Sequence, residues 1–493
     1  MKIALAQLNY TIGDFDGNTN KIIQAIENAK KDNVDIIAFA ELSITGYPPR
    51  DFLEFEDFIR RAENSIEQIK EHSKGIAVIL GAPSKNPIIE GKDLYNSVYF
   101  ISDGEEVLRQ HKALLPTYDI FDEYRYFEPA SEFGIVSFKG YKIAINVCED
   151  LWNIGNENPL YTINPMDEVI KYNPDFVINI SASPFNYNQA KSRKKVLKAN
   201  VDRYKIPFFY VNHVGAQTEL IFDGGSLVYS PDGSVFKEMD YFKEEICIFD
   251  LNEVIKGGFA SEQQDGKMEL IHDAIILGIK DYFRKLGFKK AVIGLSGGLD
   301  SAVTTVLAAE ALGNENVLAV LMPSQFSSDH SITDSIELAN NLNIQYEIIK
   351  IEDIYNSFET KLHPLFNGLP FNVAEENIQA RVRGILVMAI SNKFGNILLN
   401  TTNKSEMAVG YGTLYGDLAG GLSVIGDIYK TEVFDLARFI NKNRVIIPQN
   451  IIDKKPSAEL RPNQFDSDSL PPYDILDEIL FQYIEKRKDQ KNL

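Results

Sequence analysis

The sequence contains two series of short apolar segments that alternate with helix-like patterns. In the first series, segments such as KIALAQLNY, DFVINISAS and YKIAINV are largely apolar along their length. Strands of this kind are buried on both faces, which predicts a layered α/β arrangement with helices covering the sheets. The second series opens with the helix-like MELIHDAIILGIKDYFRKLG, followed by the strand-like KKAVIGL. The pattern therefore predicts α/β folds in both halves of the chain.

A polar, glycine-containing stretch, DLNEVIKGGFASEQQDGK, separates the two series. A chain of 493 residues is also too long for one ordinary hydrophobic core. We therefore predict a domain boundary in this stretch. The expected division is a first domain at residues 1–250, a linker at residues 251–265 and a second domain at residues 266–493.

The charge and the cysteine content restrict the partners and the compartment. A formal net charge of -20 argues against nucleic-acid and anionic-membrane partners, although it leaves room for a local basic pocket. The two cysteines, Cys148 and Cys247, do not make a disulfide framework. No apolar stretch approaches the roughly 18 residues that span a bilayer, and the start lacks a signal-peptide pattern. We expect a cytoplasmic protein without a membrane partner.

Three positions near predicted strand ends in the first half carry reactive groups: Glu41, Lys112 and Cys148. In α/β sheets, ligands bind beyond the carboxyl ends of the strands, so these side chains can converge on one site. A thiolate is a competent nucleophile, a nearby cation lowers the thiol pKa, and a carboxylate can take and return protons. Taken singly, they could also be a core cysteine, a helix-entry glutamate and a solvated lysine.

The segments FAELSITGYPPRDFL, HKALLPTYDIFDEYRYF and NVCEDLW resemble the three catalytic segments of the nitrilase superfamily of C–N hydrolases. The resemblance covers about residues 1–250 and implies an αββα sandwich. It implies that Glu41 is the general base, that Lys112 stabilises the tetrahedral oxyanion and that Cys148 is the nucleophile. Glu123 matches a second glutamate of the same pocket, whereas Cys247 is left as an inert core cysteine.

Segments like LPTYDIFDE and SASPF are typical of the glutaminase domains in that superfamily. By this resemblance Tyr118 and Ser183 contact the glutamine substrate. A basic residue usually follows the SASPF-like segment at a set distance, but Gln189 stands near that position and Lys191 lies just beyond it. Which of these two residues contacts the substrate carboxylate stays open.

The second half carries the motif AVIGLSGGLDSAVTTVLAA, in which a predicted strand leads through a glycine-rich loop into a helix. Glycines let backbone amides approach phosphate, and a helix N-terminus adds partial positive charge. Ser296 and Ser301 can donate hydroxyl hydrogen bonds, while Asp300 can ligate a metal that neutralises pyrophosphate. The Gly-Lys-Ser/Thr end of a Walker A loop is missing. The alternative is a glycine-rich turn with an N-cap aspartate.

SGGLDS resembles the pyrophosphate loop of the ATP pyrophosphatase family, which splits ATP between the α and β phosphates and adenylates a carbonyl or carboxyl oxygen. This resemblance implies a Rossmann-like parallel sheet. EENIQARVRG, LLNTTNKSEMAVGYGTLYGD and GDIYKTEVF resemble NAD synthetase segments, over roughly residues 266–493. Two of these have local alternatives, since ENIQARVRG is also a passable amphipathic helix and NKSE a helix-capping stretch. GYGTLYG lacks the Gly-x-Gly-x-x-Gly spacing, so we give it no weight as a dinucleotide signature.

The NAD synthetase resemblance implies two sets of ligand-binding residues. The ATP-binding set is Gly294, Leu295, Ser296, Gly297, Gly298, Leu299, Asp300, Ser301 and Thr401. The set for nicotinic acid adenine dinucleotide is Asn377, Arg381, Glu406, Asp417 and Lys430. Asp300 and Glu406 would hold Mg²⁺, with dinucleotide contact as the alternative role of Glu406. KPSAELRP matches a later synthetase segment through Ser457 and Glu459, whose roles stay open.

The two halves fit together, because a glutaminase releases the ammonia that a synthetase consumes. Joined, they resemble the glutamine-dependent NAD synthetase family. The resemblance implies that ATP adenylates the carboxylate of nicotinic acid adenine dinucleotide and that ammonia displaces AMP to give NAD⁺. It also implies a homo-oligomer with paired synthetase domains. Two alternatives stay open: another glutamine-fed, ATP-dependent amidase, and an ammonia-dependent synthetase with an idle N-terminal domain.

Overall fold

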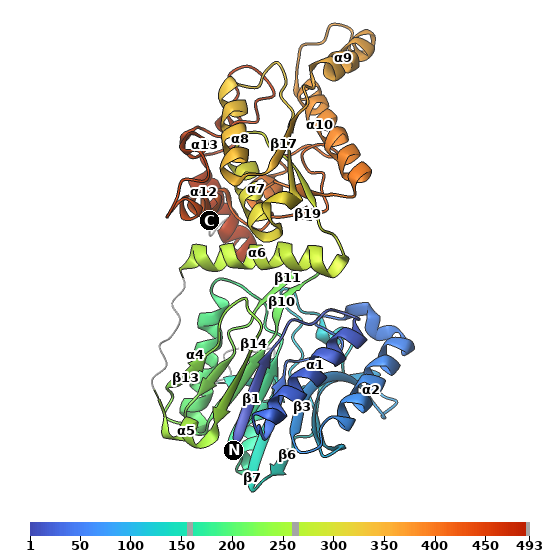
Figure 1. The fold of residues 1–493 in the computed structure, drawn as a ribbon, viewed down its shortest axis with the longest axis vertical. Helices are drawn as coiled ribbons and strands as arrows, with labels where there is room; N and C mark the ends of the chain where they lie inside the picture. The colour runs from blue at the N-terminus through green and yellow to red at the C-terminus, as the bar shows by residue number, and fades with distance from the viewer. Residues whose placement is uncertain (155–160, 259–265, 490–493) are drawn as a thin grey trace. The chain divides into compact units, whose positions relative to one another are not determined.

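The computed structural model describes residues 1–154, 161–258 and 266–489, and it divides the chain into two compact units (Figure 1). The first unit comprises residues 1–265 and the second comprises residues 266–493. Within these described ranges, no helix combines the length and the apolar character that crossing a membrane requires.

The first unit contains two six-stranded mixed sheets and a two-stranded ribbon, β10-β11. The strand order is β14-β1-β2-β3-β4-β5 in one sheet and β13-β12-β9-β8-β7-β6 in the other. The strands are β1 (Lys2–Gln7), β2 (Ile36–Phe39), β3 (Ala77–Lys85), β4 (Leu94–Ser102), β5 (Glu105–His111), β6 (Ile135–Phe138), β7 (Tyr141–Val147), β8 (Phe176–Ser181), β9 (Phe208–Asn212), β10 (Val214–Gln217), β11 (Leu220–Asp223), β12 (Leu227–Tyr229), β13 (Val235–Glu238) and β14 (Glu245–Asp250).

Side chains that alternate along each strand fill two different layers of this unit. Ile3 and Leu5 of β1 belong to the core between the two sheets, whereas Ala4 and Ala6 face the helix layer. Helices pack on the outer faces, α1 and α2 on one sheet and α4 on the other (Figure 1). The helices are α1 (Phe15–Lys31), α2 (Glu56–Glu71), α3 (Pro165–Val169), α4 (Gln189–Tyr204) and α5 (Leu251–Lys256). The expected αββα sandwich is confirmed.

The second unit is built on a five-stranded sheet with the order β17-β16-β15-β18-β19, in which every pair of neighbours is parallel. This confirms the expected parallel-sheet domain. Its strands are β15 (Ala291–Gly294), β16 (Val317–Leu321), β17 (Gln345–Ile348), β18 (Ile397–Asn400) and β19 (Leu422–Ser423). Its helices are α6 (Lys267–Leu286), α7 (Leu299–Leu312), α8 (Asp329–Leu342), α9 (Glu352–Phe366), α10 (Val373–Phe394), α11 (Lys404–Val409), α12 (Lys430–Ile440), α13 (Gln449–Asp453) and α14 (Tyr473–Leu480).

The expected linker begins with an ordered helix. Leu251 and Val254 of α5 are fully buried in the core between the sheets of the first unit. Residues 259–265 of the expected linker lie outside the described residues. We propose that the boundary of the first domain lies after α5.

Strand β5 is one that the apolar pattern does not reveal. Its sequence is EEVLRQH, and its burial alternates because one face of this edge strand is in contact with solvent. Antiparallel edge strands of this kind carry charged residues, so a search for apolar runs misses them. The strand matters because Lys112 follows it directly.

A buried ion pair connects α4 to the ribbon β10-β11 and generates a stability prediction. Arg193 and Asp223 are each about 1% exposed and form two parallel hydrogen bonds of 2.7 Å. Arg193→Met leaves the Asp223 carboxylate buried without its cation, so we expect a loss of about 3–5 kcal/mol. The single tryptophan, Trp152, reports urea unfolding of this unit by fluorescence.

The matched control is Arg203→Met, on the same helix. Arg203 pairs with Asp167 at the surface, where both side chains are at least 40% exposed. Because exposed ion pairs contribute little, this change should cost less than about 1 kcal/mol. Equal losses in the two variants would contradict the prediction.

Candidate active sites

A buried lysine lies between two buried glutamates in the first unit. The Lys112 ammonium is 2.7 Å from Oε1 of Glu41 and 2.8 Å from Oε1 of Glu123. The side chains of Lys112 and Glu41 are fully buried, and that of Glu123 is nearly so. The two carboxylates outweigh the effect of burial and hold the pKa of Lys112 well above its usual value. Lys112 is therefore a fixed cation, as an oxyanion-stabilising group requires.

Further hydrogen bonds fix the Glu41 carboxylate, which follows β2. Asn96 Nδ2 donates to Oε1 over 2.7 Å, and the backbone N–H of Ala182 donates to Oε2 over 3.0 Å. His213 Nε2 lies 2.6 Å from the Glu41 carbonyl oxygen. Sequence reasoning missed Asn96, since a lone asparagine inside a strand carries no signal that it orients a carboxylate more than 50 residues away.

Cys148 directly follows β7, as expected, and its backbone is in the left-handed region with φ of 42°. Such a φ is strained for a residue with a side chain, so neighbouring contacts must hold it. The buried Asp150 carboxylate accepts backbone N–H groups from Val147 at 3.1 Å, Ala113 at 3.0 Å and Leu114 at 2.9 Å. Burial raises the pKa of Asp150 to about 7. Through these hydrogen bonds Asp150 connects the backbone next to Cys148 with the backbone that directly follows Lys112.

The Cys148 thiol is not activated by a lowered pKa. Burial raises its pKa well above the usual value, and the Glu41 carboxylate adds to the increase. Glu149 and Glu123 raise it further, so the attraction of Lys112 is outweighed. Lys112 does lower the thiol pKa, as expected of a nearby cation, but burial and the three carboxylates together raise it more. The thiol therefore needs a base at the moment of attack.

A second buried carboxylate follows the cysteine. Glu149 Oε1 accepts hydrogen bonds from the hydroxyls of Tyr118 at 2.7 Å and Tyr161 at 2.9 Å. Burial raises the pKa of Glu149 despite these bonds. Tyr118 is a predicted substrate contact, whereas Glu149 and Tyr161 were missed. The sequence did carry a signal for Glu149: two acidic residues directly follow a predicted buried strand and Cys148, and acidic residues are rarely buried without a specific role.

The remaining predicted glutamine contacts separate into two places. Ser183 is buried beside the site, and its backbone N–H donates to Oδ1 of Asn212 over 2.8 Å. Gln189, at the start of α4, places Nε2 3.4 Å from the Ser183 hydroxyl. Lys191 is exposed on the same helix. The structure therefore brings Gln189, and not Lys191, to Ser183.

The second unit contains a cavity of about 330 Å³ at the carboxyl ends of β15, β16 and β18. The SGGLDS loop forms one side of it. Gly297 has φ of 77°, and a Cβ there would lie 2.4 Å from the Ser331 carbonyl oxygen, so only glycine fits. The Ser296 and Ser301 hydroxyls are 3.0 Å apart. Of the predicted ATP-binding residues, these line the cavity: Gly294, Leu295, Ser296, Gly298, Leu299, Asp300, Ser301 and Thr401.

Two carboxylates and a lysine meet at the helix end of the loop. Lys430 forms an ion pair with Oδ2 of Asp300 and lies 3.5 Å from Oε1 of Glu406. Asn403 Nδ2 donates to Oδ1 of Asp300 over 2.8 Å. Burial and the Asp300 charge raise the pKa of Glu406 to about 8. Because a divalent cation would stabilise two such carboxylates, these oxygen ligands fit Mg²⁺, whose other ligands are usually phosphate and water.

The predicted dinucleotide residues do not all face this cavity. Asp417 lines it and accepts the Thr413 N–H over 2.6 Å. Asn377 and Arg381, on α10, instead contact the loop that precedes Asp417. The Asn377 Oδ1 accepts the Thr413 hydroxyl at 2.7 Å, and the exposed Arg381 donates to the Leu414 carbonyl at 3.2 Å. The structure thus separates Asn377 and Arg381 from the cavity residues Glu406, Asp417 and Lys430.

Comparison with known proteins gives consistent matches for both halves. The carbon-nitrogen hydrolase family model matches residues 2–256, and the NAD synthase family model matches residues 271–493. The chain is 42% identical to the glutamine-dependent NAD(+) synthetase of Synechocystis sp. and 40% identical to that of Thermotoga maritima. Each alignment covers 100% of this chain and 90% of the relative.

Solved structures show the same similarity. The glutamine-dependent NAD+ synthetase of Acinetobacter baumannii, solved in complex with adenosine diphosphate, is 37% identical to this chain with a TM-score of 0.85. The alignment covers 99% of this chain and 89% of the other. A synthetase structure from Cytophaga hutchinsonii has a TM-score of 0.84 at 22% identity, which shows a shared fold.

The raised thiol pKa generates a prediction for Glu41→Gln. Glu41 is the charged group that raises the Cys148 pKa most, after burial itself. Its neutralisation should lower the thiol pKa, so the pH profile of Cys148 alkylation by iodoacetamide should move to lower pH, whatever the loss of this base does to the rate of attack. Mass spectrometry of the Cys148 peptide measures the rate.

The second cysteine of the chain is the internal control. The pKa of Cys247 is raised to about 12 by burial and by Glu245, and no charge at Glu41 contributes to it. Its alkylation rate should be the same in both proteins. An unchanged pH profile of Cys148 alkylation in Glu41→Gln would contradict the assignment of the raised pKa to this carboxylate.

Proposed function

The chain belongs to the glutamine-dependent NAD(+) synthetase family, and from this premise we propose that its two units catalyse successive parts of one amidation. The first unit hydrolyses glutamine to glutamate and ammonia. The second unit uses ATP to adenylate the carboxylate of nicotinic acid adenine dinucleotide, and ammonia then displaces AMP to form NAD⁺. The observation that carries the first step is the buried cysteine beside the fixed glutamate and lysine.

In the first unit, Glu41 acts as the base that the neutral Cys148 thiol needs. Glu41 takes the thiol proton as sulfur attacks the side-chain carbonyl carbon of glutamine, and Lys112 stabilises the oxyanion. Glu41 then donates this proton to the leaving ammonia, which yields a thioester. Water hydrolyses the thioester with Glu41 again as base, so the proton balance closes. Glu123 keeps Lys112 in place, because it binds the same ammonium.

Recognition of glutamine follows from the charges around the cysteine. Glutamine carries an α-ammonium and an α-carboxylate besides its amide. We assign the ammonium to the buried Glu149, which Tyr118 and Tyr161 orient through their hydroxyls. Ser183 and Gln189 lie together and supply neutral donors for the carboxylate, whereas Lys191 is exposed.

In the second unit, the cavity beside the SGGLDS loop is the ATP site of the proposal. The backbone amides of the SGGLDS loop and the N-terminus of α7 can bind phosphate at this cavity. Asp300 and Glu406 are the residues that would hold Mg²⁺, which when bound neutralises charge on pyrophosphate. Lys430 supplies a further cation beside these groups, and Asp417 orients the carboxylate end of the dinucleotide. Ser457 also lines this cavity. Asn377 and Arg381, which lie outside the cavity, are assigned to the dinucleotide.

Cys148→Ala tests the two-site reaction. With nicotinic acid adenine dinucleotide, ATP and Mg²⁺, wild type should form NAD⁺ from either glutamine or ammonium. The variant should lose at least about 1,000-fold of the glutamine-supported rate, because it lacks the nucleophile. It should keep the ammonium-supported rate, since Cys148 lies in the other unit. Chromatographic measurement of NAD⁺ gives both rates.

Two results would contradict this proposal in different ways. Equal glutamine-supported rates in wild type and Cys148→Ala would mean that the first unit is catalytically idle. No NAD⁺ from either donor would mean that a different carboxylate is the acceptor. Cys247→Ala is the matched control, and it should retain both rates.

We also infer that the protein forms a homo-oligomer through paired second units. Large apolar side chains are exposed on α9, α10 and the loop between them, and several exposed apolar side chains on neighbouring elements are typical of an interaction site. They are Phe358, Leu365, Leu369, Phe371, Val373, Ile385 and Met388. Asp353 lies near the start of α9 and Lys393 near the end of α10, and both are exposed.

Substituting Leu365 and Leu369, which are 78% and 71% exposed, tests the pairing. The double variant Leu365→Asp, Leu369→Asp should shift the mass measured by mass photometry to a smaller species, because each carboxylate would be desolvated at the interface. Phe52→Asp, at a 54% exposed position of the first unit, is the control. A wild-type protein that is monomeric at micromolar concentration would contradict the inference.

A further inference from the structure

Arg383 lines the cavity of the second unit, although sequence reasoning chose Arg381 from the same RVR triplet. Its Nε donates to the carbonyl oxygen of Met322, just beyond β16, over 3.0 Å. In the part of the chain that the structure describes, no hydrogen bond or ion pair is formed by the two terminal nitrogens of Arg383. The guanidinium is therefore anchored through one nitrogen, and its two other nitrogens remain available to the cavity.

The charge of Arg383 is incompletely compensated by the protein. Burial lowers its pKa to about 10, and the attraction of Glu459 and Asp417 only partly offsets this. Both carboxylates are engaged elsewhere. Glu459 accepts the hydroxyls of Ser328 and Ser331 at 2.8 Å each. A buried cation in this situation is best stabilised by an anion that enters the cavity.

Close backbone packing determines which arginine of the triplet faces inward. Gly384, next to Arg383, approaches the loop after α11 so closely that a Cβ would lie 2.9 Å from the carbonyl oxygen of Tyr415. On the same loop, a Cβ at Gly416 would lie 3.0 Å from Ala380. These two approaches leave α10 no freedom to rotate. Arg383 is therefore fixed toward the cavity and Arg381 toward solvent.

We propose that Arg383 binds a phosphate of the nucleotide that occupies this cavity. A guanidinium presents paired N–H donors that match two phosphate oxygens, and it stays charged at this depth of burial. The SGGLDS loop borders the same cavity, so phosphate is the anion for which the surrounding residues are suited. This assignment rests on the proposed function, because it takes the cavity to be the ATP site.

The test compares binding of ADP and of adenosine to the full chain by isothermal titration calorimetry. Arg383→Gln should weaken ADP binding at least about tenfold, because it removes a charge-assisted contact with phosphate. Adenosine lacks phosphate, so its affinity should change less than about twofold. Arg383→Lys should give an intermediate ADP affinity, since a lysine keeps the charge but loses the paired donors.

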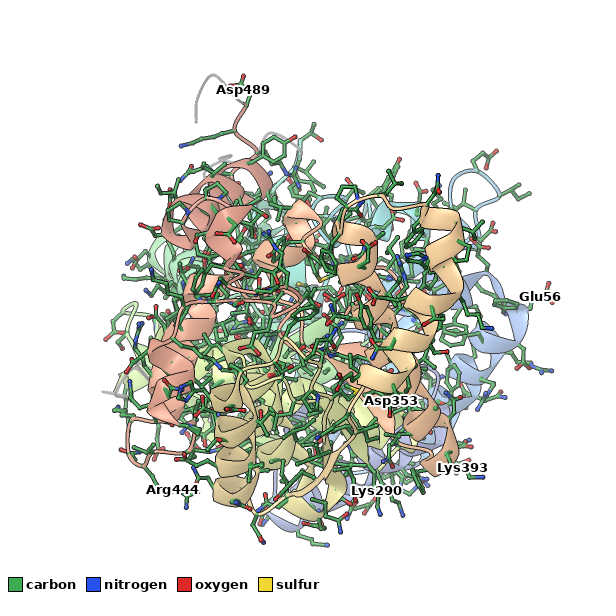
Figure 2. The ribbon with its side chains drawn as sticks, turned by 90° about the horizontal axis from the view of Figure 1, so that it is seen from above. Glu56, Lys290, Asp353, Lys393, Arg444 and Asp489 are labelled. Atoms are coloured by element: carbon green, nitrogen blue, oxygen red, sulfur yellow. The ribbon has the colours of Figure 1, made fainter. Side chains whose placement is uncertain are left out.

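The control is Lys393→Gln, a cation on the surface of the same helix (Figure 2). It should leave both affinities unchanged. Unchanged ADP affinity in Arg383→Gln would overturn the proposal, as would an equal loss for ADP and adenosine, which indicates a structural role. Wild-type protein that does not bind ADP would overturn it too. If wild type binds ADP but forms no NAD⁺, the proposed function is wrong. The ADP and adenosine affinities of the Arg383 variants still test whether Arg383 binds phosphate.

Discussion

The buried contact of Lys112 with Glu41 and Glu123 is the interaction on which the first site depends. Burying three charges is costly, and the cost is tolerated only where each group has a close partner. Asn96 and the Ala182 N–H complete the partners of Glu41, so the carboxylate has one position. The same contact holds the ends of β2 and β5 together. An arrangement that is expensive for stability therefore provides a base and a cation in fixed positions.

The surplus of carboxylates around Lys112 has a chemical consequence. Burial, together with the nearby Glu41, Glu149 and Glu123, raises the pKa of Cys148, so the thiol stays protonated until a substrate arrives. A resting neutral thiol is protected from oxidation and alkylation, because the thiolate is the reactive form. The strained backbone at Cys148 and the Asp150 contacts then fix where sulfur stands.

The second unit also places a lysine against two carboxylates, and it adds an arginine that has no ion pair in the described residues. Lys430 lies against Asp300 and Glu406, and Arg383 faces the cavity with little compensation. In a chain with a net charge of -20, the lining of this one cavity thus includes four cations, Arg383, Lys430, Lys454 and Lys455, among its carboxylates. Local field, and not net charge, decides which anions such a cavity accepts. The acidic composition argues against extended polyanion binding and is still compatible with a nucleotide site.

The sequence by itself determined both fold classes and the strand ends at which Glu41 and Cys148 stand, since short, largely apolar segments such as YKIAINV that alternate with helical patterns predict buried strands. It also identified the SGGLDS loop, through its place between a predicted strand and a predicted helix and its resemblance to the ATP pyrophosphatase family. Strand β5 escaped detection because one face is polar. Only the tertiary structure decided the charge state of Cys148, the partnership of Asn96 with Glu41, and the position of Arg383 on the cavity of the second unit. These depend on burial and on distances between residues far apart in the chain, and no local pattern encodes either quantity.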